Sequence, residues 1–270
     1  MKILLLGDVV GIAGRKAINL KLPQLIKKND LDFVIVNGEN AADDGRGITK
    51  EIANEFFKNG VDVITSGNHI WDKQETIQYI EKENRLLRPA NLADGSPGRG
   101  YAIYSSKNKK HKIGVINLMG NVFMRKTEDV FQEAKEIKKK MILKKDVDFL
   151  VVDIHGEITS EKMAAGHFFD GYATCVVGTH THVPTADTRI LEKGTAYQTD
   201  IGMCGDYNSV IGMNKENSLK KFLKDPSATN HFPALGDATI SGLLVTADEQ
   251  TGLAKKAQPI IIGGALQERN

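Results

Sequence analysis

The distribution of apolar residues along the chain predicts alternating strands and helices. Short, continuous apolar runs rich in β-branched residues are typical of strands that are buried on both faces. Such runs span residues 3–6, 33–37, 61–65, 149–154 and 175–177. Segments with helical spacing of apolar residues lie between or beside them, at residues 15–29, 49–59, 72–84 and 127–145. This alternation predicts an α/β fold.

Two segments interrupt the alternation and predict antiparallel hairpins. One hairpin lies within residues 101–118, and a turn at Gly252 divides a second within residues 239–262. Hairpin strands added to α/β units predict two mixed β-sheets packed face to face with helices outside, a four-layer αββα sandwich. We expect residues 1–270 to form one domain. A loop-rich insertion at about residues 206–235, with a short helix near 219–223, is predicted as a flap beside a site.

The composition is typical of an ordinary folded protein, with 41% hydrophobic and 26% charged residues. The net charge of +2 is too balanced for a general binder of nucleic acids or membrane surfaces. The two cysteines, Cys175 and Cys204, lack the spacing of a metal-binding pair. We therefore do not expect a reaction or a metal site that depends on cysteine. No apolar stretch approaches the roughly 18 residues of a membrane span, so we expect a cytoplasmic protein without membrane contact.

Side chains that can bind metals follow each predicted central strand. Because ligands of α/β sheets bind beyond the carboxyl ends of strands, we expect these side chains to converge on one crevice. They offer carboxylate, amide and imidazole groups without thiolates, a set that suits manganese, iron or zinc. The strand-end motifs are Gly7-Asp8, Gly38-Glu39-Asn40, Gly67-Asn68-His69, His155-Gly156-Glu157 and Gly178-Thr179-His180-Thr181-His182.

Each motif also has a purely structural interpretation. Asp8 alone could cap the following helix, and Glu39 with Asn40 could be turn residues. The imidazole of His69 beside a turn amide is poor core material, which favours a functional role. His180 and His182 flank one residue, so on an extended backbone both rings project to the same side and could grip a metal.

Taken in order, the motifs resemble the calcineurin-like metallophosphoesterase superfamily. Its most specific elements are Gly-Asn-His at residues 67–69 and His-x-His at residues 180–182. The chain is most similar to the small bacterial branch of 2′,3′-cyclic-nucleotide phosphodiesterases, which carries Gly-Glu-Asn where relatives have Gly-Asp. Val10 stands where most superfamily members have a metal-binding His, and Glu39 replaces the usual bridging Asp. Asn40 could supply a further ligand through its amide oxygen.

The resemblance implies a metal-dependent phosphodiesterase that hydrolyses 2′,3′-cyclic nucleotides with water activated between two ions. The cofactors would be two divalent or mixed-valence ions of iron, manganese or zinc. By resemblance, His69 is the general acid, with Asp72 or another carboxylate as its partner. The implied metal ligands are Glu39 as the bridge, Asp8, Asn40 and His182 at the first ion, and Asn68, His155 and His180 at the second.

Other functions remain open at this point. A phosphatase or a nuclease uses the same two-metal chemistry, and a non-catalytic regulatory module could bind a nucleotide at the metals. Glycines 7, 11 and 14 suggest a dinucleotide site, although their spacing is not Gly-x-Gly-x-x-Gly. We expect a cyclic nucleotide as the small-molecule partner, and RNA-metabolism partners and a homo-oligomer are further hypotheses. The base could stack on Tyr207, Phe222 or Phe232, and His231 of the insertion could approach the substrate.

Overall fold

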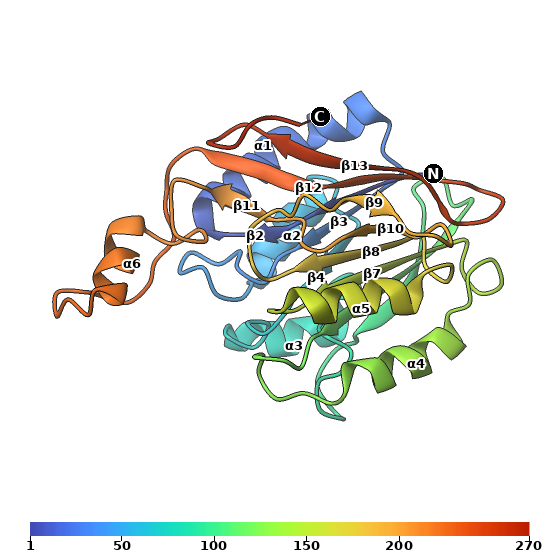
Figure 1. Ribbon diagram of the computed structural model, residues 1–270, viewed down its shortest axis with the longest axis horizontal. Coiled ribbons are helices and arrows are strands. Elements are labelled where there is room, and N and C mark those ends of the chain that lie inside the picture. The colour runs from blue at the N-terminus through green and yellow to red at the C-terminus, as the bar shows by residue number, and fades with distance from the viewer. Residues whose placement is uncertain (270) are drawn as a thin grey trace.

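The computed structural model describes residues 1–269, whose apolar runs pair into two mixed sheets (Figure 1). The first sheet has the strand order β2-β11-β12-β1-β3-β4, and β13 pairs with β12. β1 pairs parallel with β3 and antiparallel with β12, so this sheet joins N-terminal and C-terminal segments of the chain. Its strands are β1 (Lys2–Leu6), β2 (Asp8–Val9), β3 (Phe33–Asn37), β4 (Val63–Thr65), β11 (Met203–Asp206), β12 (Ala238–Ala247) and β13 (Ala254–Ile262).

The second sheet has the strand order β5-β6-β7-β8-β10-β9. Its central strands are parallel, whereas β5 and β9 are antiparallel to their neighbours. Both predicted hairpins are confirmed, as β5 with β6 and as β12 with β13. The strands are β5 (Tyr101–Ser105), β6 (Lys112–Met119), β7 (Phe149–His155), β8 (Cys175–Thr179), β9 (Arg189–Ile190) and β10 (Ala196–Gln198).

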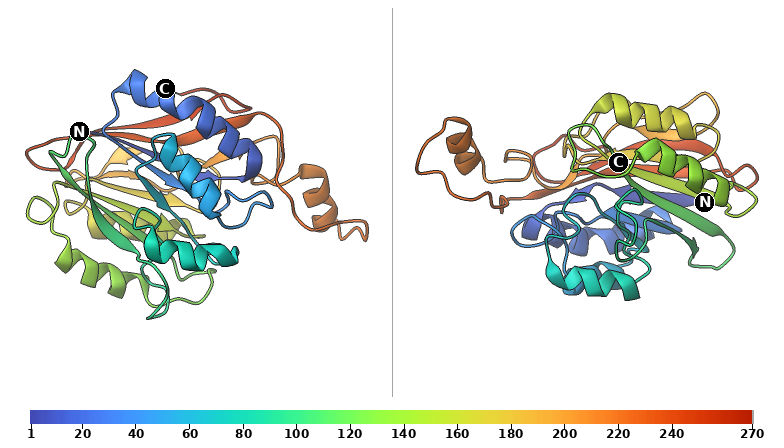
Figure 2. Two further views of the ribbon diagram at one scale, coloured as in Figure 1. Left: turned by 180° about the vertical axis from the view of Figure 1, so that it is seen from behind. Right: turned by 90° about the horizontal axis from the view of Figure 1, so that it is seen from below.

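Helices cover the outer faces of the two sheets, as Figure 2 shows. Three helices pack on the first sheet and two on the second. The sixth, α6, lies on the segment between β11 and β12, an arm that extends away from both sheets (Figure 1). Among the described residues, no helix is both long enough and apolar enough to cross a membrane. The helices are α1 (Gly11–Asn29), α2 (Lys50–Lys58), α3 (Gln74–Lys82), α4 (Val130–Lys140), α5 (Thr159–Phe169) and α6 (Lys215–Phe222).

The alternation of side chains along the strands builds three apolar layers. On β1, Leu4 and Leu6 pack against the helices of the first sheet, while Ile3 and Leu5 face the second sheet. A third cluster joins α4 and α5 to the far side of the second sheet. Three apolar layers between four layers of structure confirm the predicted αββα sandwich. That the chain forms one domain, and that residues 206–235 act as a flap, stay predictions.

One helix begins earlier than predicted, and another was not predicted. α1 begins at Gly11 rather than residue 15, because Gly14 lets the helix lie directly on β11: a Cβ at Gly14 would lie 2.1 Å from the Cys204 carbonyl oxygen. α5 was not predicted. It buries Lys162 as well as apolar residues, so the apolar stripe by which amphipathic helices are recognised is broken.

Candidate metal centre

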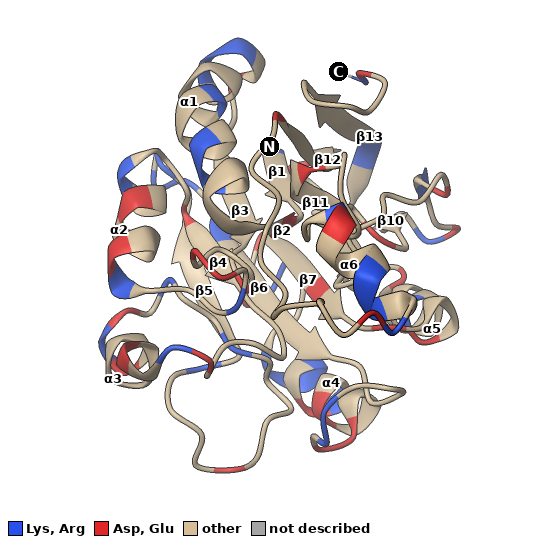
Figure 3. Ribbon diagram, turned by 90° about the vertical axis from the view of Figure 1, so that its left-hand side faces the viewer, with Lys and Arg blue, Asp and Glu red and all other residues tan. Residues whose placement is uncertain are grey.

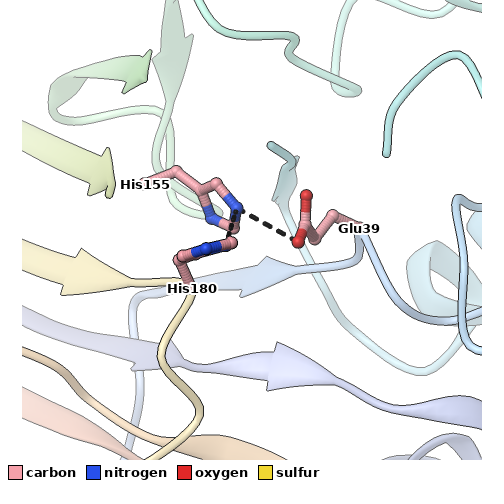
Figure 4. A group of neighbouring side chains, drawn as sticks. All are labelled: Glu39, His155 and His180. Atoms are coloured by element: carbon pink, nitrogen blue, oxygen red, sulfur yellow. Dashed lines mark hydrogen bonds and ion pairs between the residues drawn. The ribbon is translucent and has the colours of Figure 1, made fainter. Parts of the chain in front are cut away.

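The strand-end motifs of both sheets converge where the sheets meet. Asp8 follows β1, Glu39 follows β3 and Asn68 follows β4 in the first sheet. In the second sheet His155 ends β7 and His180 follows β8. Figure 4 shows Glu39, His155 and His180 directed toward one another from three separate strands. These side chains therefore form one cluster only because the two sheets pack against each other.

The first group of side chains surrounds Nε2 of His155. This atom lies 3.1 Å from Oε1 of Glu39, 3.1 Å from Oδ1 of Asn68 and 3.0 Å from Nδ1 of His180. A single ring N–H cannot donate to three acceptors, whereas four electron-pair donors facing one point are what a cation requires. Ligand atoms of Glu39, His155 and His180 all lie within 4.8 Å of one another. This group fits a divalent cation.

The second group surrounds Nε2 of His182. The ring donates from Nδ1 to the Ile211 carbonyl at 2.8 Å, which leaves the lone pair of Nε2 facing Oδ1 of Asn40 at 3.2 Å. The amide of Asn40 is held in this orientation because its Nδ2 donates to the Gly45 carbonyl at 2.8 Å. Oδ1 of Asp8 lies 4.0 Å from Nε2 of His182 and 3.7 Å from Nδ1 of His155, and within residues 1–269 it is buried without a hydrogen-bond partner. The unsatisfied oxygen of Asp8 and the amide oxygen of Asn40 also fit a cation.

Glu39 is placed at the first group by the backbone of the β4 motif. Its Oε1 faces His155, and its Oε2 accepts a hydrogen bond from the backbone N–H of His69 at 3.2 Å. A Cβ at Gly67 would lie 2.2 Å from the His155 ring and 2.3 Å from Oε2 of Glu39. Glycine at this position is therefore a steric requirement of the cluster.

Burial and close packing move the pKa values of the cluster in opposite directions. Burial raises the pKa of Asp8 to about 6. Burial disfavours the charged form of Glu39 as well, but the charge and hydrogen bond of His155 outweigh it and lower its pKa to about 2. The same pairing outweighs burial at His155 and raises its pKa to about 9. Burial and the charge of His155 lower the pKa of His180 to about 3. Such divergence is typical of functional sites.

The turn that carries His180 and His182 is not extended, so the prediction that both rings project to one side was wrong. Their φ angles are +97° and +64°, a region that L-residues seldom adopt. The two rings consequently diverge, His180 toward His155 and His182 toward Asn40. The strained turn places one imidazole in each group of side chains.

A buried ion pair holds this turn in place. Nζ of Lys162 lies 2.8 Å from Oδ2 of Asp200, and both side chains are almost completely buried. The same oxygen accepts from the backbone N–H of Thr181 at 3.1 Å and from its hydroxyl at 2.6 Å. Sequence reasoning missed both residues. Asp200 lies two residues beyond β10 and could have been found as a carboxylate that follows a strand, whereas Lys162 on α5 gave no signal.

Further side chains orient the imidazoles from outside. Nδ1 of His155 lies 3.0 Å from the hydroxyl of Thr179, which donates to buried Asp153 at 2.7 Å. Nε2 of His180 lies 3.0 Å from a carboxylate oxygen of Glu157. Partners of this kind fix the ring orientation of metal-binding histidines.

The backbone N–H of His69 contacts Glu39 of the cluster, whereas its ring pairs with a carboxylate outside the seven predicted ligands. Its Nδ1 lies 2.8 Å from Oδ2 of Asp72, the partner considered in the sequence analysis. Oδ1 of Asp72 faces Arg125 at 3.6 Å. His69 also lines the cavity over the cluster. A histidine held by a carboxylate at one nitrogen, with its ring at a cavity wall, can transfer a proton to a bound molecule.

A cavity of about 420 Å³ opens above both groups, a size typical of small-molecule sites. Phe222 and His231 of the predicted flap line it. Of the three aromatic residues predicted as candidates for base stacking, Phe222 is in this lining, and Tyr207 and Phe232 are not. The hydroxyl of Tyr207 instead accepts a hydrogen bond from the backbone N–H of Met203. The full lining is Glu39, Asn40, Gly45, Arg46, His69, Glu157, His180, Thr181, His182, Val210, Ile211, Met213, Ser218, Phe222 and His231.

The structure thus brings all seven predicted metal-binding side chains to the two groups beneath the cavity. Their role as metal ligands stays a prediction. They are Asp8, Glu39, Asn40, Asn68, His155, His180 and His182.

Comparison with known proteins identifies relatives over nearly the full chain. A 2′,3′-cyclic-nucleotide 2′-phosphodiesterase of Bacillus subtilis (strain 168) is 43% identical over 262 residues, which are 97% of each chain. A solved structure of a hypothetical protein from Thermus thermophilus has a TM-score of 0.88, with 34% identity over 100% of both chains. A structure described as a novel phosphatase of Mycoplasma pneumoniae also has a TM-score of 0.88, with 39% identity over 97% of this chain and 93% of that one.

The family profile described as YmdB-like protein matches residues 4–260. The order of the strand-end motifs had indicated a relative of the cyclic-nucleotide phosphodiesterases, and that resemblance is confirmed. The chain belongs to the YmdB-like protein family.

Proposed function

We propose that this protein is a metal-dependent phosphodiesterase that hydrolyses 2′,3′-cyclic nucleotides. The observation that carries the proposal is the convergence of Glu39, Asn68 and His180 on Nε2 of His155, at 3.0 to 3.1 Å, beneath a cavity of nucleotide size. The activity named for the Bacillus subtilis relative, at 43% identity, supports the choice of substrate.

Two cations would occupy the two groups of side chains, and Glu39 would contact both. The unsatisfied Oδ1 of Asp8 supports a first ion held with Asn40 and His182. The crowding around His155 supports a second ion held with Asn68 and His180. The oxygen and nitrogen donors fit manganese, iron or zinc.

The chain's own residues position the substrate and move a proton. Bound cations would supply an activated water and neutralise charge on the phosphate oxygens. His69 protonates the departing ribose oxygen, because its ring lines the cavity and Asp72 holds its other nitrogen at 2.8 Å. The apolar wall formed by Ile211, Met213 and Phe222 excludes water from one side of the cavity.

A dinucleotide site at glycines 7, 11 and 14 is disfavoured by the geometry. The backbone N–H of Gly11 at the start of α1 already donates to the Asn40 carbonyl at 2.9 Å. A Cβ at Gly11 would lie 2.7 Å from Pro233, so the insertion covers the place where a pyrophosphate must approach.

Hydrolysis of 2′,3′-cyclic AMP and of a generic phosphodiester, by protein supplied in turn with manganese, iron and zinc, tests the proposal. We expect metal-dependent opening of the cyclic ring that a chelator abolishes. Parallel assays with phosphopeptides and RNA distinguish a phosphatase or a nuclease. Tight nucleotide binding without turnover, in folded and metal-loaded protein, would instead indicate a regulatory module.

A further inference from the structure

The side chain of Arg46 lies at the rim of the cavity. It lies in the loop between β3 and α2, between Gly45 and Gly47, whose φ angles are +77° and +75°. Arg46 lines the cavity and is exposed. Within residues 1–269, no carboxylate lies within ion-pair distance of its guanidinium. Arginine in such a position is suited to bind an anion of a ligand.

The acidic neighbours of Arg46 are paired with other residues. Asp43 lies 2.7 Å from Arg15, and Asp44 lies 2.7 Å from Lys73. Oδ1 of Asp44 also accepts a hydrogen bond from the backbone N–H of Arg46 at 3.2 Å, so the contact of this carboxylate with Arg46 is to its backbone.

A second basic side chain, on the segment that carries α6, lines the cavity with Arg46. His231 lines the same cavity. Partial burial lowers the pKa of His231, and the charges of Lys221 and Arg46 lower it further. Lys221 is in the last turn of α6, where Figure 3 shows basic residues on the arm. The exposed carboxylate of the lining, Glu157, is 3.0 Å from Nε2 of His180. The end of the cavity near Arg46 is therefore basic.

A nucleoside 2′,3′-cyclic monophosphate cannot use this basic end together with the metal centre. It carries one phosphate, and under the proposed function that phosphate lies at the cations. The other position at which a nucleotide carries a phosphate is its 5′ oxygen, on the opposite side of the ribose. A ligand with phosphates at both positions can match both ends of the cavity.

Resting on the proposed function, we propose that Arg46 is the anion-binding group of a second phosphate subsite at the rim of the cavity. The preferred substrate is then a ribonucleotide 2′,3′-cyclic phosphate that carries a further phosphate on its 5′ oxygen. The 3′ end of a cleaved RNA strand and a free 5′-phosphorylated nucleotide share this chemistry. Charge-assisted contacts of arginine with phosphate are strong, although exposure to solvent weakens them here. We expect a preference of about tenfold that declines as salt screens the charges.

Binding of two product analogues tests the subsite without turnover. Calorimetry on metal-loaded protein compares adenosine 3′,5′-bisphosphate with adenosine 3′-monophosphate, at low salt and at about 0.5 M salt. We expect the bisphosphate to bind about tenfold more tightly at low salt. Arg46→Gln should reduce the ratio of the two affinities to near one, and Lys58→Gln, which removes an exposed cation on α2, should keep it. Equal affinities in the unaltered protein overturn the subsite.

Turnover then identifies the source of the second phosphate. The ratio of kcat/KM is measured for 5′-phosphoadenosine 2′,3′-cyclic phosphate and for the dinucleotide ApA with a terminal cyclic phosphate, each against 2′,3′-cyclic AMP. A preference for both supports RNA ends as the substrate, and a preference for the first alone supports a free nucleotide. Hydrolysis of all three at one rate overturns the inference but leaves the proposed function intact. No hydrolysis, with the bisphosphate still bound more tightly, overturns the function and retains the subsite.

Discussion

Replacement of Lys162 by Met tests whether the buried ion pair holds the histidine turn. The substitution removes the cation that lies 2.8 Å from Asp200 and leaves the carboxylate in a fully buried position. Three protein groups still donate to that carboxylate, the N–H and hydroxyl of Thr181 and the N–H of Gly202. They compensate part of the negative charge, so the folded state is weakened and remains populated.

The expected loss follows from the burial of both partners. Removing one partner of a buried pair costs about 3 to 5 kcal/mol of unfolding free energy, because it leaves an uncompensated charge in a low-dielectric interior. For a chain of this size that corresponds to a fall in Tm on the order of 10 °C. The exposed pair of Lys139 with Glu136 is the control, and Lys139→Met should cost less than about 1 kcal/mol.

Urea unfolding measures the free energy, and metal analysis of the protein at low temperature measures the effect on the site. The Lys162→Met variant should retain less metal while folded, because the turn from Thr179 to His182 loses its support. Lys162→Met combined with Asp200→Asn should recover part of the stability, since no buried charge remains. A loss below about 1 kcal/mol in Lys162→Met, or full metal content in the folded variant, would refute the reasoning.

The remaining predictions concern the metal centre and the core thiols. Glu39→Ala should lose both ions together, and two tightly bound ions in this variant would exclude a bridging role. His69→Ala should lower kcat with metal content unchanged in the same preparation, whereas loss of metal would make His69 a ligand. The pKa of His155 is raised to about 9, so in metal-free protein near pH 7 this imidazole is positively charged, with a proton on both ring nitrogens. Metal binding should therefore release about one proton, seen as a dependence of the binding enthalpy on the buffer, and apparent affinity should rise with pH up to about 9. Burial raises the pKa of both Cys175 and Cys204, so iodoacetamide at pH 8 should alkylate them only after denaturation; rapid labelling of the native protein would show that these thiols are accessible.

Much of the candidate site could be predicted because its residues follow strands in the sequence. A strand that is buried on both faces is visible as an apolar run, and the end of that run locates the next polar side chain. Glu39 and Asn68 were found in this way, and the structure places an oxygen of each 3.1 Å from Nε2 of His155. Convergence at one edge follows from the parallel pairing of β1, β3 and β4.

The ion pair and the backbone hydrogen bonds that hold the histidine turn could not be predicted as interactions, because they join distant segments of the chain. Lys162 is charged and fully buried, a combination that becomes favourable only when Asp200 is brought beside it by the fold. The backbone of His180 is also set by tertiary contacts, since its N–H donates to Asp8 at 3.0 Å, a residue 172 positions away. The prediction for the two histidines assumed an extended backbone there, and long-range bonds determine a left-handed turn instead.

The long-range pairing of the first sheet has a consequence for biosynthesis. Asp8 lies on β2, which pairs with β11. β1 pairs with β12, whose residues are synthesised roughly 240 positions after those of β1. At about 5 to 20 residues per second, the N-terminal strand spends about 12 to 50 s with one edge unpaired. During this interval its apolar face needs protection from aggregation. The carboxylate of Asp8 also cannot reach its final place before then. Under the proposed function, the finished chain would therefore acquire its metal from the ions that the released protein encounters.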